Sequence, residues 1–249
     1  MNRWQAFGIH LGVSVSIFLV LLGIIVAVWF PGILFSIDGG WNGLRIIIAV
    51  DLVLGPLLTL IVFKAGKPGL KFDLTCIALF QAVCMAGGMW VVHSERPVAL
   101  VLAFDTIYSL TADEFADYEK DVSVLQTFPG SSPKLVYTEL PENQVSAEIA
   151  NIRGQFIGDP LFIQTDRYRP FPATEAEVAA IYRWEEAVRR QVSDELLEQI
   201  PESCLLSKFV SAVTTGFVCF DAGSRELVEF YSLDYTRTST QSNVSTASL

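Results

Sequence analysis

The first 92 residues contain three long apolar runs separated by short polar stretches. The runs cover residues 7–30, 44–63 and 73–92, and each approaches the roughly 20 helical residues that cross the apolar core of a bilayer. The pattern therefore predicts three transmembrane helices. The first run is longer than the core of a typical signal peptide and has no small-x-small cleavage site after it, so we interpret it as a retained helix.

The pattern changes to shorter alternating runs after residue 93. The stretch RPVALVLAFDTIYSL (96–110) predicts a strand that follows the third helix directly, and PKLVYTEL (133–140) predicts another. Residues 208–235 predict an antiparallel meander, with DAGSR as a turn between strands. Prolines divide residues 129–172 into loops and short elements.

Two capping boxes predict helix starts in this second part, one at Thr111 with Glu114 and one at Thr174 with Glu177. After the second box, apolar residues recur at steps of three and four, which predicts one amphipathic helix that runs to about Gln199. The members of this stripe are Val178, Ile181, Trp184, Val188, Val192 and Leu196. The predicted fold class is thus a three-helix membrane domain (1–92), an α+β extracytoplasmic domain (93–235) and a disordered, Ser/Thr-rich tail (236–249).

The charge is distributed unevenly between the two parts. Residues 1–92 carry five basic and three acidic side chains, a net charge of +2, whereas the remainder carries 12 basic and 24 acidic ones, a net charge of −12. Basic residues of short loops stay on the cytoplasmic side of a membrane. Lys64, Lys67 and Lys71 between the second and third helices, and Arg3 before the first, therefore predict a cytoplasmic N-terminus and an external acidic domain.

Two of the four cysteines, Cys204 and Cys219, fall close together in the external domain. We expect them to form a disulfide bond if the compartment is oxidising. Closing so short a loop stabilises a domain by about 3 kcal/mol on the chain-entropy estimate.

A carboxylate, Asp51, lies inside the second apolar run, one turn before Gly55 and Pro56. Proline has no N–H and crowds the carbonyl four residues earlier, so we expect a kink and an unpaired Leu52 carbonyl beside Asp51. A polar notch of this kind must face protein or water rather than lipid. Either a neighbouring helix satisfies Asp51, through Ser14, Ser16, Thr75 or Gln81, or the notch docks another transmembrane segment.

Small residues recur at helical spacing in two of the apolar runs. These stripes, Gly8, Gly12 and Ser16 in the first and Ala78, Ala82 and Ala86 in the third, let another helix approach closely. They serve either packing among the three helices or the binding of a partner helix. Asp73, close to Lys71 at the start of the third helix, suits the positive end of the helix dipole and anchors this boundary.

The sequence contains no phosphate-binding glycine loop and no Cys/His cluster with metal-ligand spacing. We therefore expect no enzyme activity, no metal and no cofactor, and we expect no nucleic-acid partner. Two rival classes are a membrane-anchored sensor and an envelope enzyme or transporter component. A sensor is disfavoured because the cytoplasmic segments are too short for an output domain.

Three stretches, WQAFGIHLGVS, VDLVLGPLLTLIVFKAGKPGLKFDL and ALFQAV, resemble the membrane portion of type IV pilin accessory proteins of the TfpX/TfpZ type. The resemblance covers residues 3–85, continues through RPVALVLAFD and thins out beyond. It marks seven positions as typical of the family: Asp51, Gly55, Pro56, Lys64, Lys71, Asp73 and Gln81.

This resemblance implies a bacterial inner-membrane protein with a periplasmic domain that assists the assembly or dynamics of type IV pili and hence twitching motility. The implied partners are a cognate major pilin, through its transmembrane helix and its globular domain, together with the pilus assembly machinery and the lipid bilayer. The family is not one of enzymes.

Overall fold

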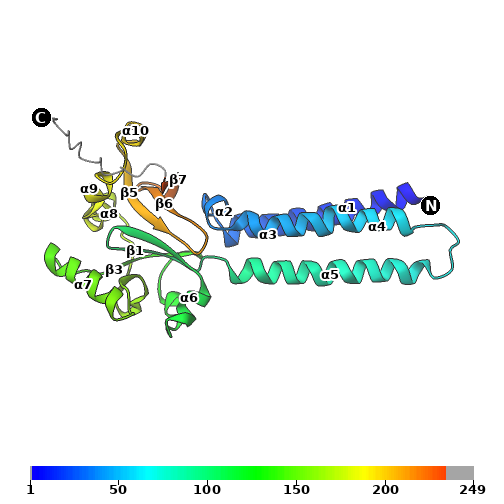
Figure 1. Ribbon diagram of the computed structural model, residues 1–249, viewed down its shortest axis with the longest axis horizontal. Helices are drawn as coiled ribbons and strands as arrows, with labels where there is room; N and C mark the ends of the chain where they lie inside the picture. Colours follow the sequence, from blue (N-terminus) through cyan, green and yellow to red (C-terminus); the bar gives the residue numbers. More distant parts are fainter. Residues whose placement is uncertain (1, 234–249) are drawn as a thin grey trace, which may run out of the picture.

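The computed structural model describes residues 2–233 and shows a rod of helices joined at one end to a sheet domain (Figure 1). Three segments of the rod are long and apolar enough to cross a membrane: Arg3–Trp29, Gly40–Val62 and Leu70–Ser94. They correspond to the three apolar runs, and a mixed α/β domain follows them, as predicted. The tail expected to be disordered, 236–249, lies outside the described residues.

The first two segments combine α-helical and π-helical turns. The first consists of α1 (Arg3–Ile24) and the π-helix η1 (Ile25–Trp29), and the second of α3 (Gly40–Ile47), the π-helix η2 (Ile48–Leu54) and α4 (Gly55–Val62). The short helix α2 (Leu34–Ile37) lies in the loop between them, and α5 (Leu70–Ser94) forms the third segment. The second segment packs against both α1 and α5.

The sheet has seven strands in the order β4-β3-β1-β2-β5-β6-β7. Strands β5, β6 and β7 form the predicted antiparallel meander, whereas β1 with β3 and β2 with β5 are parallel pairs. The strands are β1 (Ala99–Ala103), β2 (Thr106–Leu110), β3 (Lys134–Thr138), β4 (Tyr168–Pro170), β5 (Cys204–Val210), β6 (Thr215–Asp221) and β7 (Glu226–Ser232).

The single strand predicted for residues 96–110 is wrong, because this stretch forms the hairpin β1–β2. The chain reverses at Phe104, whose φ of 60° is unusual for a residue other than glycine. Neither Gly nor Pro marks the turn. The continuous apolar run instead reflects the burial of every residue of β1.

The helix predicted to run to Gln199 is also wrong in its extent. Its residues are divided among α8 (Glu175–Ile181), α9 (Glu185–Arg189) and α10 (Asp194–Leu197). The apolar stripe is still largely buried, but Val178 packs in one core cluster and Val188 in another. The chain bends between α8 and α9, and this brings the two halves of the stripe to different parts of the sheet.

Helix α7 (Gln144–Phe156), between Pro141 and Pro160, was not predicted from the sequence. The remaining short helices are α6 (Ala112–Asp117) and the 3₁₀ helices η3 (Val122–Thr127), η4 (Leu161–Ile163) and η5 (Thr165–Arg167). The capping box at Thr111 is confirmed, and the Thr174 side chain caps α8 as expected. The disulfide bond between Cys204 and Cys219 is confirmed as well and links β5 to β6.

One hydrophobic core joins the rod to the sheet. Ile25, Phe30 and Leu34 from the rod belong to the same buried cluster as Leu100 and Phe220 of the sheet. A second cluster fills the space between the sheet and α6, η3 and η4, and a third lies between the meander and α9–α10. The domain end of the rod is therefore packed against the sheet rather than tethered by a linker.

A buried carboxylate lies in this seam between rod and sheet. Asp38, in the loop after α2, is 7% exposed and accepts a hydrogen bond from the Ser109 hydroxyl of β2 at 2.5 Å. Burial raises the pKa of Asp38 to about 6, and hydrogen bonds from Ser109 and Ser211 oppose the rise. The neighbouring carboxylates Glu114 and Glu95 raise the pKa further. The folded protein thus holds the proton on Asp38 up to a higher pH than the unfolded chain does.

Substitution Asp38→Asn tests this seam. Because the folded-state pKa lies above the usual value of 3.8, ionised Asp38 costs stability above pH 6, and this cost disappears as the pH falls towards 4. The Asn variant is expected to be more stable than wild type at pH 7.5, by up to about 3 kcal/mol at 1.36 kcal/mol per unit. Thermal unfolding at pH 7.5 and 4.5 measures the difference, which should shrink at the lower pH. An equal difference at both pH values would contradict the assignment, and exposed Asp117→Asn serves as the control.

Candidate functional site

Each of the three apolar segments contributes one buried polar side chain near its midpoint. Asp51 lies in the middle of Gly40–Val62, Gln81 lies close to the middle of Leu70–Ser94, and Ser14 lies close to the middle of Arg3–Trp29. Their exposed fractions are 7%, 8% and 6%, respectively. We call these three residues the polar layer. Burying polar side chains so deep between apolar helices costs free energy unless they bind one another or a partner.

The π-helical register of η2 explains how the polar layer is arranged. The last π hydrogen bond runs from the Gly55 N–H to the Val50 carbonyl. The next donor in that register would be Pro56, which has no N–H. The Asp51 carbonyl is therefore left over, and the Gln81 Nε2 donates to it at 3.4 Å. The freed carbonyl is thus that of Asp51 rather than that of Leu52, because the expectation of Leu52 assumed an α-helical register.

Gly55 makes room for this contact. A Cβ atom on Gly55 would lie 1.9 Å from the Gln81 Nε2, which no side chain can tolerate without movement. Gly55, Pro56 and Gln81 thus act together, because the proline removes a donor, the glutamine replaces it and the glycine admits the glutamine. Asp51, Gly55 and Pro56 lie in consecutive turns of the second segment, beside Gln81 of the third.

The carboxylate of Asp51 is not fully satisfied by this arrangement. Its Oδ2 is buried and has no hydrogen-bond partner among the described residues. Two of the other candidate partners bond elsewhere, since the Ser16 hydroxyl donates to the Gly12 carbonyl and the Thr75 hydroxyl to the Lys71 carbonyl. Ser14 lines the same cavity as Asp51. One oxygen of the carboxylate is therefore available to a further donor.

A cavity of about 190 Å³ adjoins the polar layer. The cavity lies between α1 and α5, which face each other across it while the second segment packs against both. Its polar lining consists of the polar layer and His10, whose Nδ1 is 2.6 Å from the Thr59 hydroxyl. We call this cavity and the flanking faces of α1 and α5 the groove. The remaining lining residues are Val13, Ile17, Phe18, Leu21, Ile47, Ala78, Ala82 and Met85.

The two small-residue stripes lie on exposed faces. A Cβ atom added to Gly8 or Gly12 would meet nothing within 4 Å, and Ser16 is exposed as well. Ala78 and Ala82 line the groove, whereas Ala86 does not. In contrast, Gly43 is packed, because a Cβ there would lie 1.9 Å from Val92. The stripes are thus open to another helix, and Gly43 and Gly55 are the glycines that hold the segments together.

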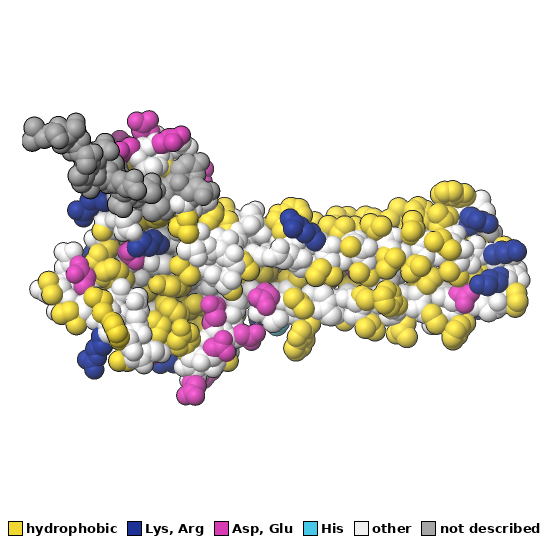
Figure 2. All heavy atoms as spheres, in the orientation of Figure 1, with side chains coloured by type: hydrophobic (Ala, Val, Ile, Leu, Met, Phe, Trp, Pro, Cys, Tyr) yellow, Lys and Arg dark blue, Asp and Glu magenta, His cyan; other side chains and the backbone are white. Residues whose placement is uncertain are grey.

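Three lysines lie at the connection between the second and third segments. Lys64, Lys67 and Lys71 fall in and next to the connection between α4 and α5, and Lys67 forms an ion pair with Asp73 at 2.6 Å. Figure 2 shows basic side chains gathered at the free end of the rod, whereas most acidic side chains lie over the sheet domain. The predicted orientation of the chain in the membrane rests on this separation of basic from acidic side chains.

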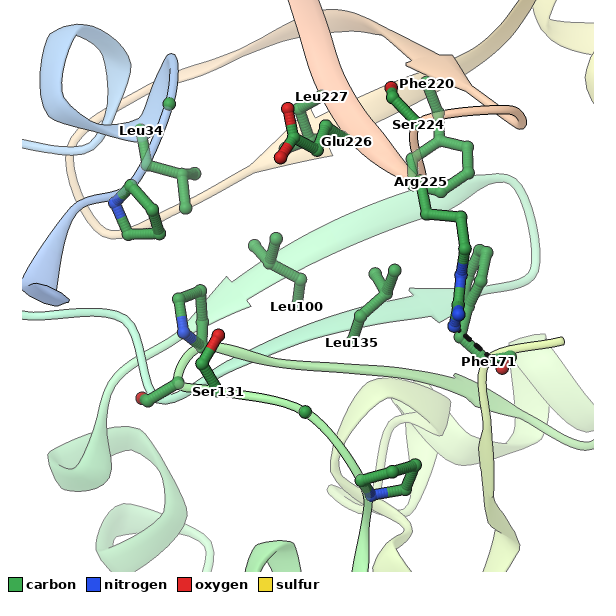
Figure 3. A pocket seen from close by; sticks show the side chains of 16 residues that line it. Leu34, Leu100, Ser131, Leu135, Phe171, Phe220, Ser224, Arg225, Glu226 and Leu227 are labelled. Carbon is green, nitrogen blue, oxygen red and sulfur yellow. Dashed lines mark hydrogen bonds between the residues drawn. The ribbon is translucent and has the colours of Figure 1, made fainter. Parts of the chain in front are cut away.

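A second cavity, of about 410 Å³, lies in the seam (Figure 3). Leu34 of the rod faces Leu100 and Leu135 of the sheet across it, and Arg225 donates to the Phe171 carbonyl at 3.1 Å. Arg225 and Glu226 are the ionisable residues among those that line it. This cavity therefore offers apolar surface but no acid–base pair.

No metal-binding cluster is found in the described part of the chain. Residues 2–233 contain no group of three His, Cys, Asp or Glu side chains that could hold a metal ion. The groove combines instead an unpaired carboxylate oxygen, apolar walls and small residues. Such a surface can bind an apolar helix that carries a hydrogen-bond donor or a cation. The contact of His10 with Thr59 was not foreseen, because no pattern in the sequence links residues 49 positions apart.

Substitution Gly55→Ala tests the polar layer. The added methyl group displaces the Gln81 amide and leaves the Asp51 carbonyl unpaired, which should cost about 1–3 kcal/mol. Thermal unfolding in detergent measures the loss. The control is Gly12→Ala, which should be neutral or slightly stabilising because a Cβ there meets no atom within 4 Å. Equal stability of the two variants would show that Gln81 is not essential to the packing.

Comparison with known proteins shows similarity to fimbrial assembly proteins. A 107-residue stretch, 42% of the chain, is 34% identical to the fimbrial assembly protein, serogroups C1 and C2, of Dichelobacter nodosus, and it covers 81% of that relative. The fimbrial assembly proteins of serogroups I and E1 of the same organism are 34% and 35% identical over 107 residues. The match spans 41% of each of these two, less than half of their length. No family model and no solved structure matches the chain.

Proposed function

The chain belongs to the family of fimbrial assembly proteins, and from this premise we propose that it is an accessory factor of the TfpX/TfpZ type in type IV pilus biogenesis or dynamics. The protein that it binds in this role is a cognate major pilin. It acts beside the pilus assembly machinery and does not catalyse a reaction. The observation that carries the proposal is the unpaired, buried carboxylate oxygen of Asp51 in a groove between two apolar helices.

The groove suits the transmembrane helix of a pilin. A pilin subunit waits in the membrane as a single span, and the amine at its processed N-terminus is a cation that a carboxylate can bind. Asp51 supplies an oxygen without a partner, and Ala78 and Ala82 allow close approach of a helix along α5. The cost of burying the Asp51 carboxylate is thus offset when its oxygen binds the cation of the partner helix.

The same proposal places the chain in the bacterial inner membrane. The three apolar segments span the bilayer, the lysine-rich connection after α4 faces the cytoplasm, and the sheet domain stands in the periplasm. The disulfide between Cys204 and Cys219 supports this side for the domain, because such bonds persist in oxidising compartments.

Reporter fusions test the orientation. A fusion after residue 68 should report a cytoplasmic position and a fusion after residue 120 a periplasmic one, because Lys64, Lys67 and Lys71 hold the connection inside. Alkaline phosphatase and green fluorescent protein activities provide complementary readouts. Phosphatase activity of the fusion at residue 68 would reverse the whole assignment.

Substitution Asp51→Leu tests the docking role. The variant should fold and insert normally, since it removes a buried polar group, but it should reduce surface pili and twitching as much as a deletion of the gene. Asp51→Asn should have a milder effect, because it keeps hydrogen bonding and loses only the charge. Pilus number, pilin co-purification and the abundance of the variant are measured together. Normal piliation by Asp51→Leu at normal abundance would assign Asp51 to internal packing.

A further inference from the structure

Helix α7 packs on the sheet domain with its small residues and leaves its large apolar residues exposed. Its small residues Ala147 and Gly154 are buried, whereas its large apolar residues point outward. Val145, Ile149, Ile152 and Phe156 have exposed fractions of 62%, 58%, 55% and 87%, respectively. Their spacing of four, three and four residues places them on one face of the helix. We call these four residues the α7 stripe.

The face of α7 that carries its small residues is the one that packs on the domain. Ala147 is fully buried, and Ala150 packs against the core cluster that fills the space between the sheet and η4. A Cβ atom on Gly154 would lie 3.3 Å from the Gln164 Nε2. The helix cannot turn its stripe inward without exposing this face and bringing four larger side chains against the domain. An apolar face that is held outward in this way indicates an interaction site.

The position of α7 excludes the membrane that holds the rod as its partner. Figure 1 shows α7 at the end of the sheet domain that is remote from the rod, and Figure 2 shows hydrophobic side chains exposed over this corner of the domain. The bilayer that surrounds the rod ends near the C-terminus of α5, on the opposite side of the domain. A partner of the stripe must therefore rise well above the membrane surface.

We infer that the α7 stripe binds the extramembrane domain of the same pilin subunit whose transmembrane helix lies in the groove; this inference rests on the proposed function. The stripe exposes a few hundred Å² of apolar surface, short of the roughly 800 Å² per partner of a stable interface such as a homodimer. A partner that is already held in the groove needs less area, because the second contact is then intramolecular in effect and profits from a high local concentration.

Charges beside the stripe define the partner's chemistry. Arg153 follows Ile152, is exposed and makes no side-chain hydrogen bond or ion pair within residues 2–233. Glu148 lies on the other flank, where the Gln144 side chain donates to it at 3.4 Å. The matching surface on the pilin domain is therefore an apolar patch with an acidic side chain opposite Arg153.

Site-specific photo-crosslinking in cells tests the inference. p-Benzoylphenylalanine replaces Ile152 in the full chain, and in a second strain it replaces Ser146, an exposed position on another face of α7. Pilin should be captured from position 152 and much less from position 146, with mass spectrometry identifying the product. Capture of a second copy of this chain from position 152, or capture of nothing, would overturn the inference.

A double variant and the groove variant separate this inference from the proposed function. Ile149→Asp with Ile152→Asp should keep the melting temperature, because both side chains are exposed, but should lower the pilin recovered with the protein by about tenfold. The matched control is Ser146→Asp with Gln155→Asp. If Asp51→Leu abolishes pilin recovery while the stripe variant does not, the stripe inference fails and the groove stands. If neither variant changes pilin recovery, both fail.

Discussion

A single missing hydrogen-bond donor organises the helical half of this protein. Pro56 cannot donate to the Asp51 carbonyl in the π register of η2, and a carbonyl that is buried between apolar helices needs another donor. Gln81 reaches across from α5 to supply the bond, and it can do so only because position 55 is glycine. The spacing between the second and third segments follows from this contact. The unpaired oxygen of Asp51 then lies at the base of the groove.

The shared core between rod and sheet gives the groove a fixed relation to the domain. The ends of the first two segments enter the same hydrophobic cluster as the sheet, and Asp38 is buried in this seam against Ser109. A linker would allow the domain to swing, but a packed core does not deform continuously. Displacing a helix at the domain end of the rod therefore disturbs the sheet face that it covers.

This rigidity bears on how the proposed pilin partner would be held at the two proposed contacts. The groove lies at the middle of the rod, and the α7 stripe lies at the far end of the domain. A membrane-anchored subunit with a helix and a globular head has the same two-part form as this protein. A subunit that is held by two weak contacts dissociates readily once one of them breaks. This behaviour suits the proposed role of an assembly factor that binds a pilin and then releases it. The large stable interface of a permanent complex would not allow this.

The sequence by itself determined the features that depend on local chemistry. The three apolar runs, the capping box at Thr111, the pairing of Cys204 with Cys219 and the meander at the C-terminal end follow from hydrophobic period, side-chain reach and loop length. Asp51, Gly55 and Pro56 stood out because a carboxylate and a proline are unusual in an apolar helix. These signals involve residues close to one another in the chain.

The tertiary structure decided everything that depends on which surfaces meet. The stripe from Val178 to Leu196 was bent into three helices because its two halves pack in different core clusters. The β1–β2 hairpin was not foreseen because its turn, at Phe104, contains neither Gly nor Pro. The carbonyl that Gln81 satisfies depends on a π register that local pattern does not specify. The outward orientation of the α7 stripe depends on the packing of Ala147 and Gly154 on the domain, because periodicity shows that a helix has an apolar face but not what that face will meet.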